Sequence, residues 1–313
     1  MLHSSSGSPM GGSKDGQHHV LLATDGSLAA HWPEVWIKGL TWRNRPTVEV
    51  LSVADVGATL PEWLQQPGDP QVGLLVENLH EEHLAEASSI GEGAAARLRD
   101  AGFTSAATTR HGEPAIELLA RVRELRPTLV AIGSRGRSDV QPMLLGSVSA
   151  QVARYTTAPA LVARQAGALV EALPQRVVLV VDPETRARAA VAWLDRHGWL
   201  DRSRVILLGL LGFAGSGMEA DRSPVGAILT EAQRTARRVL DDLAQHIASK
   251  ALDVSVEVRH GHPLGECRDM AERSQADLVV LTRPEHTPGR YPLAEKVTRY
   301  LAVSVLVVPS NGS

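Results

Sequence analysis

The second half of this chain repeats the pattern of the first half. Identical residues recur at a spacing of 157 positions, which pairs, among others, Asp25 with Asp182, Trp36 with Trp193, Trp42 with Trp199, Val48 with Val205 and Leu51 with Leu208. The turns at residues 111–114 and 260–263 lie 149 positions apart, and the apolar segments 161–162 and 306–307 lie 145 positions apart. A spacing that holds within segments and changes only between them indicates a tandem duplication. The 313 residues therefore contain two copies of one domain.

Within each copy, short apolar segments alternate with longer segments of helical composition. In the first copy we expect strands at residues 19–23, 48–53, 106–110, 128–132 and 160–163, and helices at residues 28–41, 74–101, 115–125 and 147–155. Several of these strands are apolar at every position, which is typical of parallel strands covered on both faces. The alternation predicts an α/β fold with a parallel sheet in each copy.

A polar tail precedes the two copies, and a linker separates them. Residues 1–16 are rich in serine and glycine and show no apolar period, so we expect a disordered tail. The same residues lack the basic start and apolar run of a signal peptide. We assign the two copies to residues 17–165 and 173–310.

The composition limits what the protein can bind. The net charge is −3, so no general positive field favours nucleic acid or an anionic membrane as a partner. The longest apolar segments have the length of strands, which predicts that no transmembrane helix is present. Cys267 is the single cysteine, so neither an internal disulfide nor a multi-cysteine metal site can form. These features predict a cytoplasmic protein.

A loop with three glycines follows the fourth predicted strand of the first copy. Residues 133–147 carry glycine at positions 133, 136 and 146 and serine at position 147. Ligands of parallel sheets bind beyond the carboxyl ends of the strands, and the free N–H groups at a helix start attract phosphate. Arg135 and Arg137 add positive charge, and Ser147 could cap the helix or donate its hydroxyl to a phosphate. The loop predicts a nucleotide-phosphate site. Taken alone, it also fits a flexible loop with a helix cap, and it matches neither the Walker nor the Gly-x-Gly-x-x-Gly pattern.

The spacing Gly-x2-Gly-x9-Gly-Ser over residues 133–147 resembles the ATP-binding signature of universal stress proteins. Three further segments resemble that family, namely Ala23-Thr24-Asp25-Gly26-Ser27, Gly112-Glu113-Pro114 and Ala158-Pro159-Ala160-Leu161-Val162. The resemblance covers nearly the whole chain after residue 17, in both copies. It implies two tandem open five-stranded parallel sheets with helices on both faces, the adenine nucleotide α-hydrolase-like fold.

The resemblance also implies a nucleotide site in the first copy. Asp25 and the backbone around Ala23 and Val53 would hold adenosine, and the glycine loop would hold ribose and phosphates. The candidate binding residues are Ala23, Thr24, Asp25, Val53, Ile132, Gly133, Arg135, Gly136, Arg137, Gly146, Ser147 and Val148. The implied ligand is ATP, which Mg²⁺ can accompany. The final strands, 160–163 and 305–308, would pair with each other inside the chain; a homodimer and an unknown protein partner are left open.

The second copy departs from the pattern at the same loop. Gly133, Gly136, Gly146 and Ser147 are matched there by Thr282, Glu285, Tyr291 and Pro292. A glutamate would set negative charge beside the phosphates, and the prolines of this loop remove backbone donors. We therefore expect the second copy to bind ATP weakly or not at all.

No other motif indicates a catalytic centre or a metal site. His80 and His83 have a spacing that could hold a metal on a helix, but a solvated charged face explains them better. His111 and His260 recur in both copies, which favours a structural role in a turn. The four recurring tryptophans are expected to be anchors of the core or of helix ends. The sequence predicts an ATP-binding sensor or regulator without a catalytic centre; a slow ATPase, a cyclic AMP-binding protein and a nucleotide-free interaction module are the alternatives.

Overall fold

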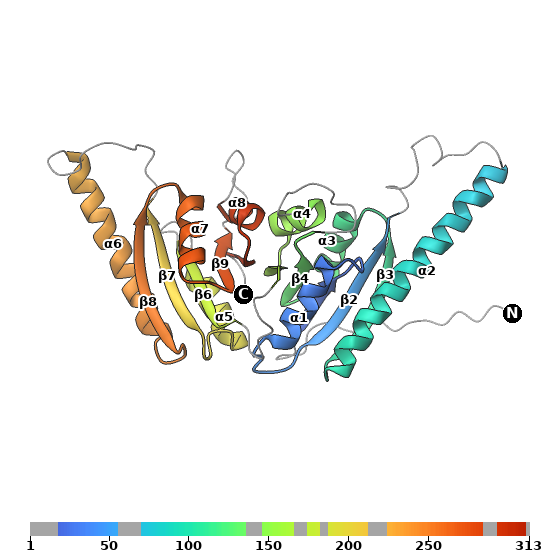
Figure 1. Ribbon diagram of the computed structural model, residues 1–313, viewed down its shortest axis with the longest axis horizontal. Helices are drawn as coiled ribbons and strands as arrows, with labels where there is room; N and C mark the ends of the chain where they lie inside the picture. Colours follow the sequence, from blue (N-terminus) through green and yellow to red (C-terminus); the bar gives the residue numbers. More distant parts are fainter. Residues whose placement is uncertain are drawn as a thin grey trace.

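The computed structural model describes residues 18–55, 70–135, 146–165, 174–181, 187–211, 224–283 and 293–310. Figure 1 shows two similar halves that stand side by side and meet at the centre of the molecule. The tail predicted for residues 1–16 lies outside the described residues, as do residues 166–173 of the linker.

The first half alternates strands and helices as its sequence predicts. Its elements are β1 (His19–Ala23), a 3-10 turn (Ala29–His31), α1 (Trp32–Gly39), β2 (Thr47–Ala54), α2 (Pro70–Asp100), β3 (Thr104–His111), α3 (Pro114–Leu125), β4 (Leu129–Gly133), α4 (Ser147–Tyr155) and β5 (Ala160–Ala163). The helix predicted at residues 28–41 is a 3-10 turn followed by the shorter α1. Leu40 is extended, which ends α1. The Trp42 indole N–H donates to the Ile37 carbonyl at 2.9 Å, so a side chain supplies a hydrogen bond at the end of the helix.

The second half repeats this order. Its elements are β6 (Arg176–Val181), α5 (Ala187–His197), β7 (Arg204–Leu211), α6 (Pro224–Ile247), β8 (Asp253–His260), α7 (Pro263–Arg273), β9 (Leu278–Arg283), α8 (Leu293–Tyr300) and β10 (Ser304–Pro309). None of the helices in the described part of the chain combines the length and apolar character needed to cross a membrane.

The two five-stranded halves are joined into one sheet. Its strand order is β3-β2-β1-β4-β5-β10-β9-β6-β7-β8. All pairings inside each half are parallel, whereas β5 and β10 pair antiparallel, with Leu161 opposite Leu306. The predicted contact between the final strands is therefore confirmed. It turns the two expected sheets into halves of a mixed, mostly parallel ten-stranded sheet.

The core follows this joined sheet. On one face, α1, α2, α5 and α6 cover a single apolar cluster that runs through both halves. On the other face, α3 and α4 cover one cluster in the first half, and α7 and α8 cover another in the second. Inner strands such as β4 and β5 are buried at every position, which is why they are apolar at every position.

Tryptophans contribute to the shared cluster where the halves meet. Trp36, Trp193 and Trp199 are buried, as expected for core anchors. Trp42 of the first half meets Trp199 of the second edge-on, with ring centroids 5.7 Å apart, and Trp199 meets Trp193 at 4.9 Å. The duplicated anchors therefore also pack across the boundary between the copies.

Candidate functional site

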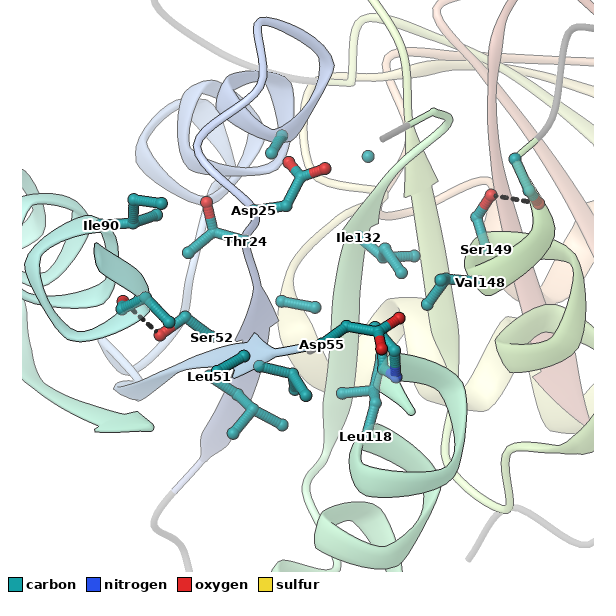
Figure 2. A pocket seen from close by; sticks show the side chains of 18 of the residues that line it. Thr24, Asp25, Leu51, Ser52, Asp55, Ile90, Leu118, Ile132, Val148 and Ser149 are labelled. Carbon is teal, nitrogen blue, oxygen red and sulfur yellow. Dashed lines mark hydrogen bonds between the residues drawn. The ribbon is translucent and has the colours of Figure 1, made fainter. Parts of the chain in front are cut away.

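A pocket of about 410 Å³ opens beyond the carboxyl ends of β1, β2 and β4 in the first half. Its volume lies in the range of small-molecule sites. Figure 2 shows Thr24 and Asp25 on one side of the pocket and Val148 and Ser149 on the other. The described lining residues are Ala23, Thr24, Asp25, Ala30, Leu51, Ser52, Val53, Ala54, Asp55, His83, Glu86, Ala87, Ile90, Pro114, Leu118, Ile132, Gly133, Arg135, Gly146, Ser147, Val148 and Ser149.

The turn after β1 forms the first wall of the pocket. The Asp25 carboxylate accepts the backbone N–H of Ser27 at 2.9 Å, and Gly26 takes the left-handed conformation at φ +74°. The backbone N–H of Thr24 donates to the Leu51 carbonyl at 3.0 Å, which ties the turn to β2. An aspartate that accepts a backbone N–H two residues ahead stabilises such a turn. Asp25 therefore holds its own loop in shape at the edge of the pocket.

The floor comes from β2 and from one face of α2. The Ser52 hydroxyl donates to the Ala87 carbonyl at 2.6 Å, so strand and helix are linked directly behind the pocket. A Cβ atom added at Gly91 would lie 2.9 Å from Ser52 Oγ, which shows how closely α2 approaches. Past this contact Asp55 lines the pocket from the end of β2.

The far wall consists of residues at the two ends of the glycine loop and of the start of α4. The Gly146 N–H donates to the Ser134 carbonyl at 2.7 Å, and the Ser149 hydroxyl lies 3.1 Å from the carbonyls of both Ser134 and Gly146. These bonds join the two ends of the loop. The N-cap residue of α4 is Gly146, and Ser147 is an exposed first helical residue. Of the two roles that the sequence leaves open for Ser147, the helix cap is therefore excluded, and Ser147 lines the pocket.

Gly133 is explained by packing. A Cβ atom at this position would lie 2.5 Å from the Ala29 carbonyl oxygen, a backbone atom that cannot turn aside. Glycine here allows β4 to end against the 3-10 turn, whatever the pocket holds. This is a reason for the glycine that sequence reasoning did not find.

The charges around the pocket are divided. Asp25 and Asp55 follow β1 and β2 and Glu86 lies on α2. Arg135 lines the pocket together with Gly146 and Ser147 at the amino end of α4. Unpaired N–H groups at a helix start favour an anion. Behind Arg135, burial and then the Arg135 charge lower the pKa of Arg164 to about 10. The pocket thus suits a ligand with an anionic group at the α4 side.

Ten of the twelve predicted binding residues line this one pocket. They are Ala23, Thr24, Asp25, Val53, Ile132, Gly133, Arg135, Gly146, Ser147 and Val148. The other two, Gly136 and Arg137, lie outside the described residues.

Sequence reasoning missed the contribution of α2. His83 was assigned to a solvated face, but it lines the pocket with Glu86, Ala87 and Ile90. The spacing 83, 87, 90 puts residues on one helix face and could have suggested a shared wall. His80 instead bonds the Val76 carbonyl at 2.9 Å, and its ring lies 4.9 Å from that of His111. Among the described residues, no three histidine, cysteine or acidic side chains come together as a metal site.

The matching region of the second half has different chemistry. A pocket of about 490 Å³ lies between the ends of β6 and β7 and the helix α6. At the 149-residue spacing, Ala232, Thr235 and Val239 stand where His83, Glu86 and Ile90 stand in the first half. Asp182, Glu285, Tyr291 and Pro292 lie outside the described residues.

Comparison with known proteins finds one protein family whose model matches this chain twice. The model of the universal stress protein family matches residues 17–164 and again residues 174–309. The chain belongs to the universal stress protein family. It has two of the family's domains in tandem.

The chain is also similar to individual proteins. A Bacillus subtilis protein, universal stress protein YxiE, is 34% identical over 89 residues, which is 28% of this chain and 60% of that relative's length. The crystal structure of a universal stress protein from Archaeoglobus fulgidus covers 94% of this chain and 98% of its own, with 18% identity and a TM-score of 0.63. A universal stress protein in complex with cAMP matches 47% of this chain and 97% of its own, with 20% identity and a TM-score of 0.34.

Proposed function

We propose that this universal stress protein binds ATP in the pocket of its first domain and acts as a nucleotide-dependent sensor or regulator. One observation carries the proposal. Ten residues predicted from separate parts of the sequence line a single pocket at the carboxyl ends of parallel strands. That edge of a parallel sheet is where nucleotides bind in open α/β folds.

The lining suggests how the ligand would lie. The apolar side chains of Val53, Leu118 and Ile132 offer a surface for a purine ring. The amino end of α4, with Gly146 and Arg135 beside it, offers N–H donors and positive charge to the phosphates. Mg²⁺ would enter with the triphosphate.

We propose no catalytic centre, because a regulator needs only different affinities for ATP in two states of the protein. The second domain would bind ATP weakly or not at all, because Glu285 replaces a glycine of the loop and the prolines there remove backbone donors. Slow hydrolysis, cyclic AMP as ligand, and a nucleotide-free interaction module are the alternatives that experiment must separate.

The test uses the full chain in a calorimetric titration with ATP, ADP, cyclic AMP and GTP. Mass spectrometry of the denatured, freshly purified protein identifies any bound nucleotide. We expect ATP to bind and the Gly136→Glu variant, which copies the second repeat, to lose binding, because the new carboxylate repels the phosphates.

The matched control is Gly265→Glu, since a Cβ at Gly265 on α7 meets no atom within 4 Å. We expect the control to bind ATP like the unchanged protein. Absence of nucleotide and of binding heat in the unchanged protein would refute the proposal. If cyclic AMP binds more tightly than ATP, cyclic AMP replaces ATP as the proposed ligand. Phosphate release during the titration would establish the slow ATPase.

A further inference from the structure

The carboxyl end of α4 is held by an arginine from the other domain. Arg283, the last residue of β9, donates through Nη1 to the carbonyls of Ala153, at 3.3 Å, and Arg154. Its Nη2 donates to the carbonyl of Thr156. These carbonyls belong to the end of α4, where a helix has no partners of its own for its C=O groups. A side chain of the second domain therefore completes a helix of the first.

The opposite end of the same helix is the wall of the nucleotide pocket. Gly146, Val148 and Ser149 all line the pocket. Since α4 has nine residues, it is a rod of about 14 Å. A displacement at its carboxyl end is carried to the N–H groups at its start. The groups that would face the phosphates are thus positioned in part by Arg283.

Two further contacts join this helix region to the second domain. The Arg154 guanidinium lies 3.9 Å from the buried carboxylate of Glu295 on α8. In return, Arg164 of the first domain donates to the carbonyls of Val303, at 3.1 Å, and Thr298 at the end of α8. Each domain thus supplies an arginine that donates to the carboxyl-terminal region of a helix in the other.

The place of Arg283 in the repeat explains why it can serve the other domain. At the 149-residue spacing it corresponds to Ser134. In the first domain the backbone carbonyl of Ser134 accepts the Gly146 N–H and the Ser149 hydroxyl, so these bonds do not depend on the side chain at this position. The second repeat has an arginine at this position, and the side chain extends to α4.

We propose that Arg283 is a positioning residue of the nucleotide site in the first domain, so that the second domain sets the affinity of that site. The inference rests on the proposed ATP binding. Because coupling between sites is reciprocal, ATP binding must also tighten the contact between the domains. The second domain is then a regulator of the first rather than a second binding site.

The first experiment measures the dissociation constant for ATP in the full chain by calorimetry. We expect Arg283→Ala to weaken ATP binding by about fivefold or more, the usual lower range of coupling between sites. Arg283→Lys should recover part of the loss, because an ammonium keeps the charge but lacks the fork that reaches several carbonyls. The control is Arg273→Ala on α7, an exposed arginine paired with Asp269 one turn earlier, and it should bind ATP unchanged.

The second experiment needs no variant. Hydrogen exchange of the unchanged protein is compared with and without saturating ATP, and amides of α8 and β10 are expected to exchange more slowly with ATP. Unchanged exchange there would overturn the inference, as would a folded Arg283→Ala protein with unchanged affinity. If the unchanged protein binds no ATP, the proposed function fails and the inference fails with it. If the unchanged protein and Arg283→Ala bind ATP with the same affinity, only the inference is refuted.

Discussion

Acid should destabilise the folded protein through one buried histidine that lies where the two domains meet. His197, at the end of α5, is 2% exposed and stacks on Trp193 with ring centroids 4.2 Å apart. His18 of the first domain lies 4.6 Å away, and the Trp42 ring lies at 6.4 Å. The His197 Nδ1–H donates to the Trp193 carbonyl at 2.6 Å, while its Nε2 is buried and makes no hydrogen bond within the described residues. A proton added at Nε2 would therefore find no acceptor.

The size of the effect follows from the pKa. Burial, with smaller contributions from the charges of His18 and Arg196, lowers the pKa of His197 from 6.5 to about 4. The unfolded chain then binds the proton more readily than the folded one, so stability is complete above pH 6.5 and is lost as the pH falls toward 4. Between pH 7 and pH 5 this histidine should cost about 2 kcal/mol of unfolding free energy. The pKa of His18 is also lowered, first by burial, which acts in the same direction.

The assay is urea unfolding across this pH range in the unchanged protein and in His197→Phe. Phenylalanine keeps an aromatic ring against Trp193 but cannot titrate, so the variant should lose stability at pH 7 and then depend less on pH. His246→Gln on the exposed side of α6 is the control and should keep the full dependence. Equal pH dependence in the unchanged protein and His197→Phe would refute the reasoning.

Two further predictions concern packing. Gly133→Ala should lower the unfolding free energy by about 1–3 kcal/mol in urea titrations, because its Cβ would lie 2.5 Å from a backbone oxygen. Gly265→Ala, in open space on α7, should instead be neutral or raise it by up to about 1 kcal/mol, and equal losses in both would contradict the packing argument. Cys267 is fully buried, and burial, with a smaller effect of Glu266, raises the pKa of its thiol to about 12. A thiol reagent at neutral pH should therefore label it only after unfolding, and rapid labelling of the native protein would show that α7 opens.

Much of the fold could be predicted because its signals are local. The strands β1, β4 and β5 are short apolar segments between polar turns, and α4 and β5 have the bounds expected from the sequence. The lining of the candidate pocket could be predicted in part, since the residues after β1 and β4 are placed by the carboxyl ends of the strands that precede them. The early end of α1 could not, because it involves the side chain of Trp42, whose indole N–H donates to the Ile37 carbonyl.

By itself the sequence determined that the chain is a duplicated α/β domain and that one copy carries a glycine loop beyond its sheet. Repeat spacing and apolar period are properties of neighbouring residues, and they survive without knowledge of packing. Only the tertiary structure decided which face of α2 reaches the pocket, why Gly133 must be glycine, and that Arg283 of one domain holds α4 of the other. These depend on helix rotation and on contacts between residues more than a hundred positions apart, which no local pattern contains.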